Sequence, residues 1–179
     1  MSSSVVAKRY ALALFQLAKE KGLLDQIESE LAIIKETIKS NPEFETLLQS
    51  PKFSIEKKQQ MVKEIFASVH EYTLNTLLLL VERRRENAIV EVADHFTKLT
   101  NDEKGIAQAE VYSVRPLTEE ETKALSETFA AKVGKKSLVI NNIIDTDLLG
   151  GIKLRIENRI FDGSLRGKLD RLQRKLLVE

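Results

Sequence analysis

The sequence predicts an α+β protein in which an N-terminal all-α bundle of six helices precedes a smaller α+β domain. Through the first hundred residues, apolar side chains recur every three or four positions, which is the period of a helix with one buried side. After Gly105 the pattern changes to alternation between two faces, which is typical of a strand. We therefore place the boundary near 101–105 and expect domains at 1–105 and 106–179.

Residues that end or cap helices divide the first region. Gly22 ends a first helix, Asn41-Pro42 a second and Pro51 a third, and Ser54 is suited to cap a fourth. Because the connections are short, neighbouring helices are expected to pack antiparallel. The six apolar sets at helical spacing lie within Ala7–Ala18, Leu24–Ile38, Phe44–Leu48, Met61–Phe66, Leu74–Val81 and Ile89–Leu99.

The second region begins with a predicted strand and a capped helix. The segment IAQAEVYSV, which follows Gly105, alternates between two faces, and Pro116 ends it. Thr118 and Glu121 then have the spacing of a capping box, which opens a helix that Gly134 closes.

The remainder of this region is predicted to hold two strands, a hairpin and a last helix. The two strands are 137–144 and 152–156, and Glu157-Asn158 is a turn candidate before a return strand at 159–161. The sequence Asp-Gly-Ser at 162–164 breaks that strand and caps the last helix. One apolar stripe, spaced four, three and four, runs along this helix: Leu165, Leu169, Leu172 and Leu176.

Composition excludes several classes of protein. Hydrophobic residues make up 42% and charged residues 31% of the chain, as in ordinary globular proteins. The absence of cysteine excludes disulfides and thiolate metal sites, and two histidines, His70 and His95, leave little material for a metal site or a catalytic triad. The apolar run 74–81 is far shorter than the ~20 residues that span a bilayer. We expect a binding or structural protein without cofactor or metal, rather than an enzyme.

The glycine-rich segment GSLRGKL, which begins at Gly163, has some likeness to a phosphate-binding loop. The spacing between its two glycines is one residue short, and Leu169 stands where Ser or Thr would be needed to reach a magnesium ion. These glycines are therefore interpreted as turn residues.

Basic residues are concentrated at the C-terminal end. Residues 151–179 hold eight basic and four acidic side chains, although the net charge of the whole chain is +1. A solvated face that complements the helix dipole, a nucleic-acid-binding α+β module, and a surface for an acidic or amphipathic protein partner all remain open. We favour the protein partner, because no aromatic side chain lies on the last helix to stack on a base. The basic residues of this helix are Arg166, Lys168, Arg171, Arg174 and Lys175.

Two helices carry more apolar surface than one buried side requires. Apolar or small residues nearly encircle the helix within Val5–Ala18, and the helix that contains Leu77–Val81 has five consecutive apolar residues. Either these helices are central in the bundle, or together they leave a groove for an amphipathic helix of a partner. Small residues such as Ala13 would allow close approach of such a helix.

Two segments resemble a known family. AKRYALALFQLAKEKG and LLGGIKLRIENRIFDGSLRGKLDRL are similar to the opening helix and the C-terminal signature of the delta subunit of bacterial F-type ATP synthases. The mitochondrial counterpart is the oligomycin-sensitivity-conferring subunit, and the resemblance covers the full length. It implies a non-catalytic stator subunit of the proton-translocating ATP synthase. This subunit would link the alpha/beta catalytic head to the b-subunit peripheral stalk and resist rotor torque. It would lie at the cytoplasmic face of the bacterial cell membrane, held there only through the complex, with no cofactor and no nucleic acid.

The resemblance also implies two partner-binding regions. The N-terminal bundle would bind an N-terminal helix of an alpha subunit between its first and fifth helices, which matches the two over-apolar helices. The C-terminal domain, from Gly150 onward, would meet the C-terminal ends of the two b subunits. At Glu157-Asn158-Arg159 the chain departs from the glycine or aspartate that many members carry in this turn. The residues expected to bind the alpha-subunit helix are Tyr10, Ala13, Leu14, Leu77, Leu80 and Val81. Those expected to bind the stalk are Lys153, Arg155, Arg159, Arg166, Lys168 and Arg171.

Overall fold

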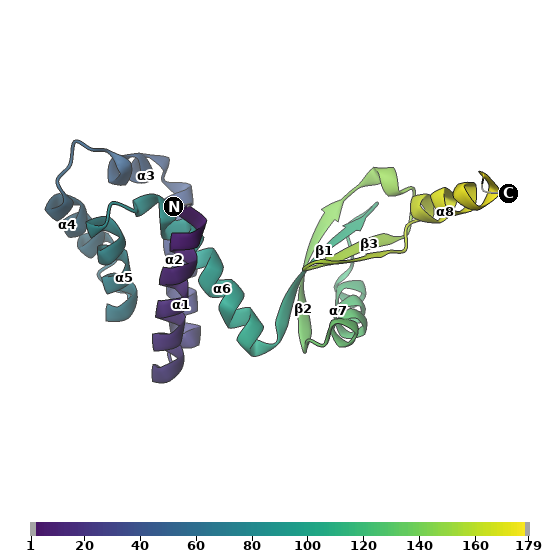
Figure 1. Cartoon of the computed structure of the whole chain (residues 1–179), viewed down its shortest axis with the longest axis horizontal. Coiled ribbons are helices and arrows are strands. Elements are labelled where there is room, and N and C mark those ends of the chain that lie inside the picture. The colour runs from purple at the N-terminus through teal and green to yellow at the C-terminus, as the bar shows by residue number, and fades with distance from the viewer. Residues whose placement is uncertain (1–2, 178–179) are drawn as a thin grey trace. The chain divides into compact units, whose positions relative to one another are not determined.

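The computed structural model describes residues 3–177, which belong to two compact units, Met1–Thr100 and Asn101–Glu179. The side chains of residues 3, 45, 175 and 177 lie outside the described part, so the basic side chain predicted at Lys175 is not placed. The first unit is helical and the second combines a sheet with helices (Figure 1), so the predicted α+β class is confirmed.

Within residues 3–104 the chain forms six helices and one short 3-10 turn, as the apolar periodicity predicts. The helix ends follow the signals in the sequence, because the first helix stops before Gly22 and the third begins at Pro42 and stops before Pro51. The elements are α1 (Ser3–Lys21), α2 (Leu24–Ser40), α3 (Pro42–Gln49), α4 (Ile55–Ile65), α5 (Glu71–Glu82), η1 (Glu86–Ala88) and α6 (Ile89–Lys104).

The core of the helical unit is built from one apolar stripe of each long helix. In α2 the stripe consists of Ile27, Leu31, Ile34 and Ile38, and each of these side chains is at most 4% exposed. Phe96 of α6 is fully buried and meets Phe15 of α1 edge to face, with ring centroids 6.1 Å apart.

Polar contacts between helices complete this unit. The carboxylate of Glu30 in α2 accepts hydrogen bonds from the backbone N–H of His70 and the hydroxyl of Thr73, and so holds the start of α5. Lys58 of α4 and Glu86 of η1 form an ion pair of 2.8 Å whose side chains are each 8% exposed. Removing one partner would leave a buried charge, so the pair fixes the position of α4 against η1.

The second unit is a four-stranded mixed sheet with two helices. Its strand order is β2-β1-β3-β4, in which β1 and β2 are parallel and the other neighbours antiparallel. The predicted hairpin is present, and its turn places Glu157 at a φ of 51°. The elements are β1 (Ile106–Ser113), α7 (Glu119–Val133), β2 (Ser137–Ile144), η2 (Thr146–Leu148), β3 (Ile152–Ile156), β4 (Arg159–Asp162) and α8 (Leu165–Leu177).

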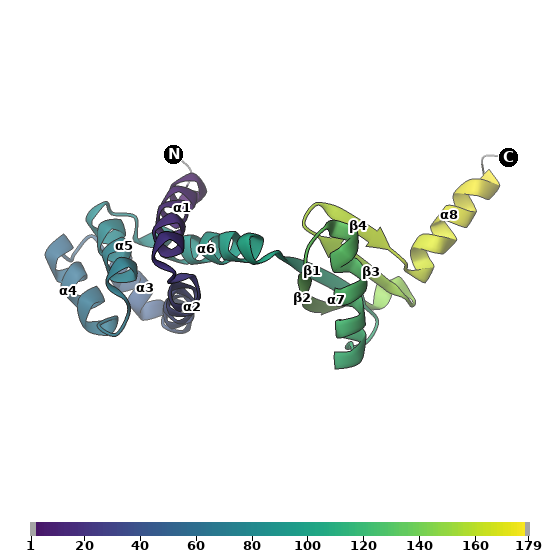
Figure 2. The same ribbon diagram turned by 90° about the horizontal axis from the view of Figure 1, so that it is seen from below.

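Helix α7 connects the two parallel strands and covers one face of the sheet (Figure 2). Ala107, Ala109 and Val111 alternate along β1 toward this helix and are at most 2% exposed. The predicted capping box is confirmed: the Thr118 hydroxyl accepts from the Glu121 N–H, and the Glu121 carboxylate accepts from the Thr118 N–H.

The end of α5 contains a backbone conformation that the sequence does not signal. Arg84 has a φ of 53°, in the left-handed region that favours glycine. Its N–H donates to the Val81 carbonyl, and the Arg85 N–H donates to the Leu80 carbonyl, which is the hydrogen-bond pattern of a Schellman motif.

We therefore expect Arg84→Gly to increase the free energy of unfolding by about 0.5–1 kcal/mol, because glycine removes the strain of the left-handed conformation. Urea denaturation of the full chain measures this change. Arg83→Gly is the matched control. Arg83 has a φ of −84°, which any residue can adopt, so glycine at this position is expected to lower the free energy of unfolding. Loss of stability in Arg84→Gly would contradict this account of the helix end.

Candidate partner-binding surfaces

Helix α1 buries one side and leaves apolar residues on the other. On the outer side Val5 is 47% and Leu12 is 43% exposed, and Ala13 beside Leu12 is exposed as well. Lys8 and Arg9 lie between them in the sequence and are also exposed. The buried side consists of Val6, Ala7, Ala11, Leu14, Phe15 and Ala18, each at most 8% exposed.

Helix α5 contacts α1, and most of its residues from Leu74 to Val81 are apolar. Leu79 is 40% exposed, and Leu74 and Leu78 are half-buried and pack against the core. Val5 and Leu12 on α1 and Leu79 on α5 are thus exposed apolar side chains of the kind that amphipathic helices bind.

The structure separates the six residues expected to bind the N-terminal helix of the alpha subunit into two groups. Ala13 is exposed and Tyr10 is half-buried with its ring against the core, so both contribute to the surface of α1. The other four are core residues that shape this surface from beneath: Leu14, Leu77, Leu80 and Val81, each at most 3% exposed.

The candidate set does not include three exposed apolar residues of α1 and α5, namely Val5, Leu12 and Leu79. Nearly every position of α1 is apolar or small, so periodicity alone does not identify which side faces the core. The sequence feature that indicated these residues was the excess of apolar side chains on α1 and α5.

The six stalk candidates lie in three separate places of the second unit. Lys153 and Arg155 lie on the face of the sheet opposite the core residues Leu154 and Ile156. Lys153 stands 5.9 Å from the centre of the Tyr112 ring, and an Arg155 nitrogen is 3.5 Å from a Glu110 oxygen.

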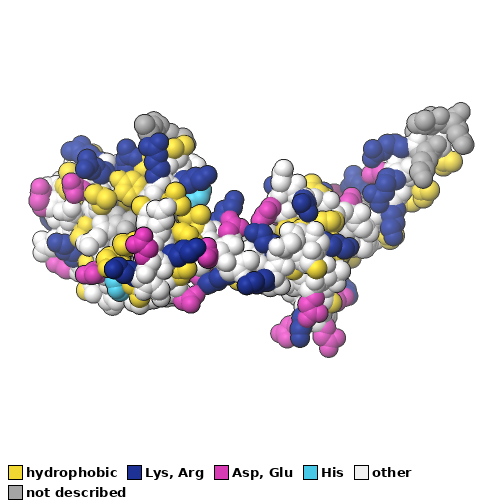
Figure 3. Space-filling model, turned by 60° about the horizontal axis from the view of Figure 1, so that its bottom comes forward, with side chains coloured by type: hydrophobic (Ala, Val, Ile, Leu, Met, Phe, Trp, Pro, Cys, Tyr) yellow, Lys and Arg dark blue, Asp and Glu magenta, His cyan; other side chains and the backbone are white. Residues whose placement is uncertain are grey.

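The remaining candidates lie on the hairpin and on α8. Arg159 donates to the Lys132 carbonyl of α7 at 3.4 Å. Arg166, Lys168 and Arg171 are exposed on α8, where Figure 3 shows Lys and Arg side chains gathered around hydrophobic ones.

A set of short contacts fixes the start of α8 on the sheet. The Asp162 carboxylate accepts from the N–H and the hydroxyl of Ser164, at 2.9 and 2.7 Å. The Ser164 oxygen accepts from the Gly167 N–H at 3.0 Å and so caps the helix. These hydrogen bonds from Ser164 hold the pKa of the Asp162 carboxyl below its usual value. We call Asp162, Ser164 and Gly167 the α8 clamp.

Two glycines of the C-terminal signature allow this junction to close. A Cβ on Gly167 would lie 2.6 Å from an Asp162 carboxylate oxygen, and one on Gly151 would lie 2.6 Å from the Gly163 carbonyl. Gly151 also has a φ of 75°. Gly167, the second glycine of the segment with some likeness to a phosphate loop, therefore serves close packing between the sheet and the helix.

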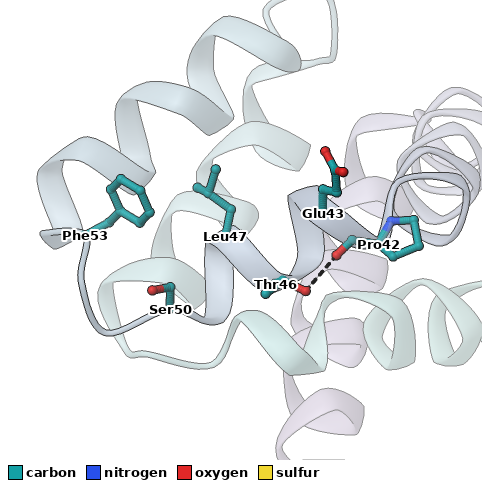
Figure 4. A pocket seen from close by; sticks show the side chains of 6 residues that line it. All are labelled: Pro42, Glu43, Thr46, Leu47, Ser50 and Phe53. Atoms are coloured by element: carbon teal, nitrogen blue, oxygen red, sulfur yellow. Dashed lines mark hydrogen bonds between the residues drawn. The ribbon is translucent and has the colours of Figure 1, made fainter.

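Two surface pockets lie on the part of the chain that the structure describes. A shallow pocket of about 410 Å³ is lined by residues of α3 and of the following loop, with Leu47 and Phe53 extending to the same side (Figure 4). Among its described lining residues, Glu43 carries the titratable group. A second pocket, of about 220 Å³, lies beside the α8 clamp, and its side chains include Asp145, Lys153 and Arg166.

Other chemical features of the described residues also bear on function. Across residues 3–177, no group of three or more His, Asp or Glu side chains is placed to hold a metal ion. Among the helices of the same part of the chain, none is long and apolar enough to cross a membrane.

Fold and surfaces together define an α+β protein of two compact units, each with exposed apolar side chains on a helix. The family model described as "ATP synthase delta (OSCP) subunit" matches residues 6–176, and the chain belongs to this family. The family consists of stator subunits of the F-type ATP synthase, which are structural rather than catalytic.

Individual relatives agree along the whole chain. A protein named ATP synthase subunit delta from Geobacillus sp. (strain WCH70) is 52% identical over 177 residues, with 99% of each chain covered. One of the same name from Priestia megaterium is 48% identical over 178 residues, with 99% of this chain and 98% of the relative covered. A chain in the Toxoplasma gondii mitochondrial ATP synthase hexamer is 26% identical, with a TM-score of 0.72 and coverage of 96% and 97%.

The α8 clamp leads to a prediction about stability. Ser164→Ala removes the cap of α8 and a hydrogen-bond donor to Asp162, and we expect a loss of about 1 kcal/mol. Faster amide hydrogen exchange at Gly167 would report the change, because its N–H donates to the Ser164 hydroxyl oxygen that alanine lacks.

Thr118→Ala is the control for this prediction. Thr118 caps α7 in the same unit, so its loss should speed exchange at Glu121 and leave α8 unchanged. Equal protection of Gly167 in the wild-type chain and in Ser164→Ala would contradict the clamp.

Proposed function

We propose that this subunit joins the catalytic head of the ATP synthase to its peripheral stalk, with one partner on each unit. The helical unit binds the N-terminal helix of an alpha subunit, and the second unit binds the C-terminal ends of the b subunits. The complex places the subunit peripherally, at the cytoplasmic face of the bacterial cell membrane. In this position it keeps the head from turning with the rotor.

The exposure of the apolar residues Val5 and Leu12 on α1 is the observation that carries the first half of the proposal. Val5 and Leu12 stand seven residues apart, about two helical turns, so a partner helix that lies along α1 can contact both. Ala13 beside them is small enough to let two helix backbones approach closely. The aromatic ring of Tyr10 is anchored in the core and borders this surface.

Charge and apolar exposure on α8 support the second half. The exposed leucines of α8 provide area for burial, and the basic side chains beside them provide complementarity to an acidic partner. Lys153 and Arg155 on the open face of the sheet extend the basic surface of this unit.

The first half of the proposal predicts binding of an isolated peptide. Isothermal titration of the full chain with the first twenty or so residues of the alpha subunit should give a Kd of about 1 µM or tighter, which corresponds to about −8 kcal/mol. Ala13→Lys should weaken this binding by at least about tenfold, because the long charged side chain keeps the helices apart.

Ala32→Lys is the matched control. Ala32 is an exposed alanine in the middle of α2, so the same change there should leave the affinity unaltered. Failure of the wild-type chain to bind the peptide, or equal affinity of the two variants, would rule out α1 as the binding surface.

A further inference from the structure

Helix α8 has an apolar stripe that its own unit does not cover. The helix packs mainly against η2, and Figures 1 and 2 show it leaving the sheet with no other described element of its own unit alongside. Side chains of this size and exposure on one helix form a patch that usually marks an interaction site. The stripe consists of Leu165 (49% exposed), Leu169 (56%), Leu172 (57%) and Leu176 (75%).

The spacing of these leucines identifies the kind of packing. Intervals of four, three and four residues place two leucines in each seven-residue repeat, which is the seam of a coiled coil. A helix that packs on its own sheet or bundle usually has a wider apolar stripe. The narrow seam of α8 is therefore suited to a single partner helix that runs along it.

Basic side chains lie directly beside the seam. Arg166 and Lys168 occupy the positions next to Leu165 and Leu169, where coiled coils place the charges that select a partner. Both are exposed, and Arg166 has only a 3.8 Å contact with the exposed Asp147. Such an exposed pair is weak and leaves Arg166 available.

The rest of α8 adds to this positive charge. In the sequence repeat, Lys175 occupies the same flanking position as Lys168, seven residues later. Arg171 and Arg174 fall on the outer side of the helix, and Asp170 is the single acidic residue between Leu165 and Leu177. A partner would therefore meet positive charge on both sides of the leucine seam.

We propose that α8 pairs with one stalk helix in a coiled-coil-type contact, and that Arg166 and Lys168 select a helix with an apolar seam and acidic flanks. The inference rests on the proposed function, because it names the chemistry that the stalk segment must present. A second copy of this chain would place basic flanks against basic flanks. A nucleic acid would leave the four leucines in water.

The test titrates the full chain and its variants with the C-terminal segment of the b subunit, at several salt concentrations. Leu169→Ala/Leu172→Ala should weaken binding by at least about tenfold, because two seam contacts are lost while alanine preserves the helix. Arg166→Gln/Lys168→Gln should weaken it about three- to tenfold and reduce its salt dependence. Circular dichroism verifies that each variant retains its helix content.

The control removes the same charge from positions away from the leucine seam, one on the outer side of α8 and one on α7. Arg174→Gln/Lys123→Gln changes the net charge equally and should alter the affinity by less than about twofold. A loss of affinity equal to that of Arg166→Gln/Lys168→Gln would show that the positive charge acts only through non-specific electrostatic attraction. That result would overturn the assigned role of the flanking residues.

The remaining outcomes separate this inference from the proposed function. No binding of the b segment to the wild-type chain would overturn the stalk-binding half of the proposed function, and the inference with it. Full binding by Leu169→Ala/Leu172→Ala would overturn the coiled-coil contact alone. Two further results would also overturn it: self-association of the chain that the leucine variant abolishes, or tight, steeply salt-dependent binding of a DNA duplex.

Discussion

Each unit of this protein contains a helix whose exposed apolar side chains the unit itself does not cover. In the first unit this helix is α1, which buries Leu14 and Phe15 on one side and leaves Val5 and Leu12 in water on the other. In the second unit it is α8, whose four seam leucines are 49–75% exposed. Burial of apolar surface is the dominant favourable term in association, so both helices gain free energy when a partner covers them.

The two surfaces differ in the way they are supported. Helix α1 lies against the core of its unit, so its outer side is a rigid platform on which a helix can seat. Helix α8 is held at its start by the Asp162 and Ser164 hydrogen bonds and has little support beyond it. A protein that links two bodies under torque benefits from two separate attachments, because each attachment raises the effective concentration of the other.

Much of the fold follows from local signals in the sequence. Helix ends at Gly22 and Pro51, the Thr118 capping box and the strand at 137–144 depend on nearby residues alone. The parallel pairing of β1 with β2 depends on contacts distant in the chain, and local pattern does not determine it. The left-handed Arg84 was not predictable, because no glycine or asparagine marks it.

The partner-binding surfaces were predictable in kind but not in detail. An excess of apolar residues indicates that α1 and α5 matter, yet it does not reveal their rotation about their own axes. Leu77 and Leu80, which the sequence predicted as contact residues, lie in the core, whereas Val5 and Leu12, which it did not, are exposed. On α8 the polar positions between the leucines define the stripe, so the seam can be identified from the sequence. The contact between Gly167 and Asp162 depends on side-chain geometry that no spacing reveals.

The central claim is that one chain holds two partners at once, one on each unit. Sedimentation equilibrium tests this claim directly, on a mixture of the full chain, a peptide from the N-terminus of the alpha subunit and a segment from the C-terminal end of the b subunit. The account predicts a complex that contains one chain and both partners, with the affinity for the b segment the same in the presence and absence of saturating alpha peptide. Displacement of one partner by the other would contradict it, because both would then occupy the same surface.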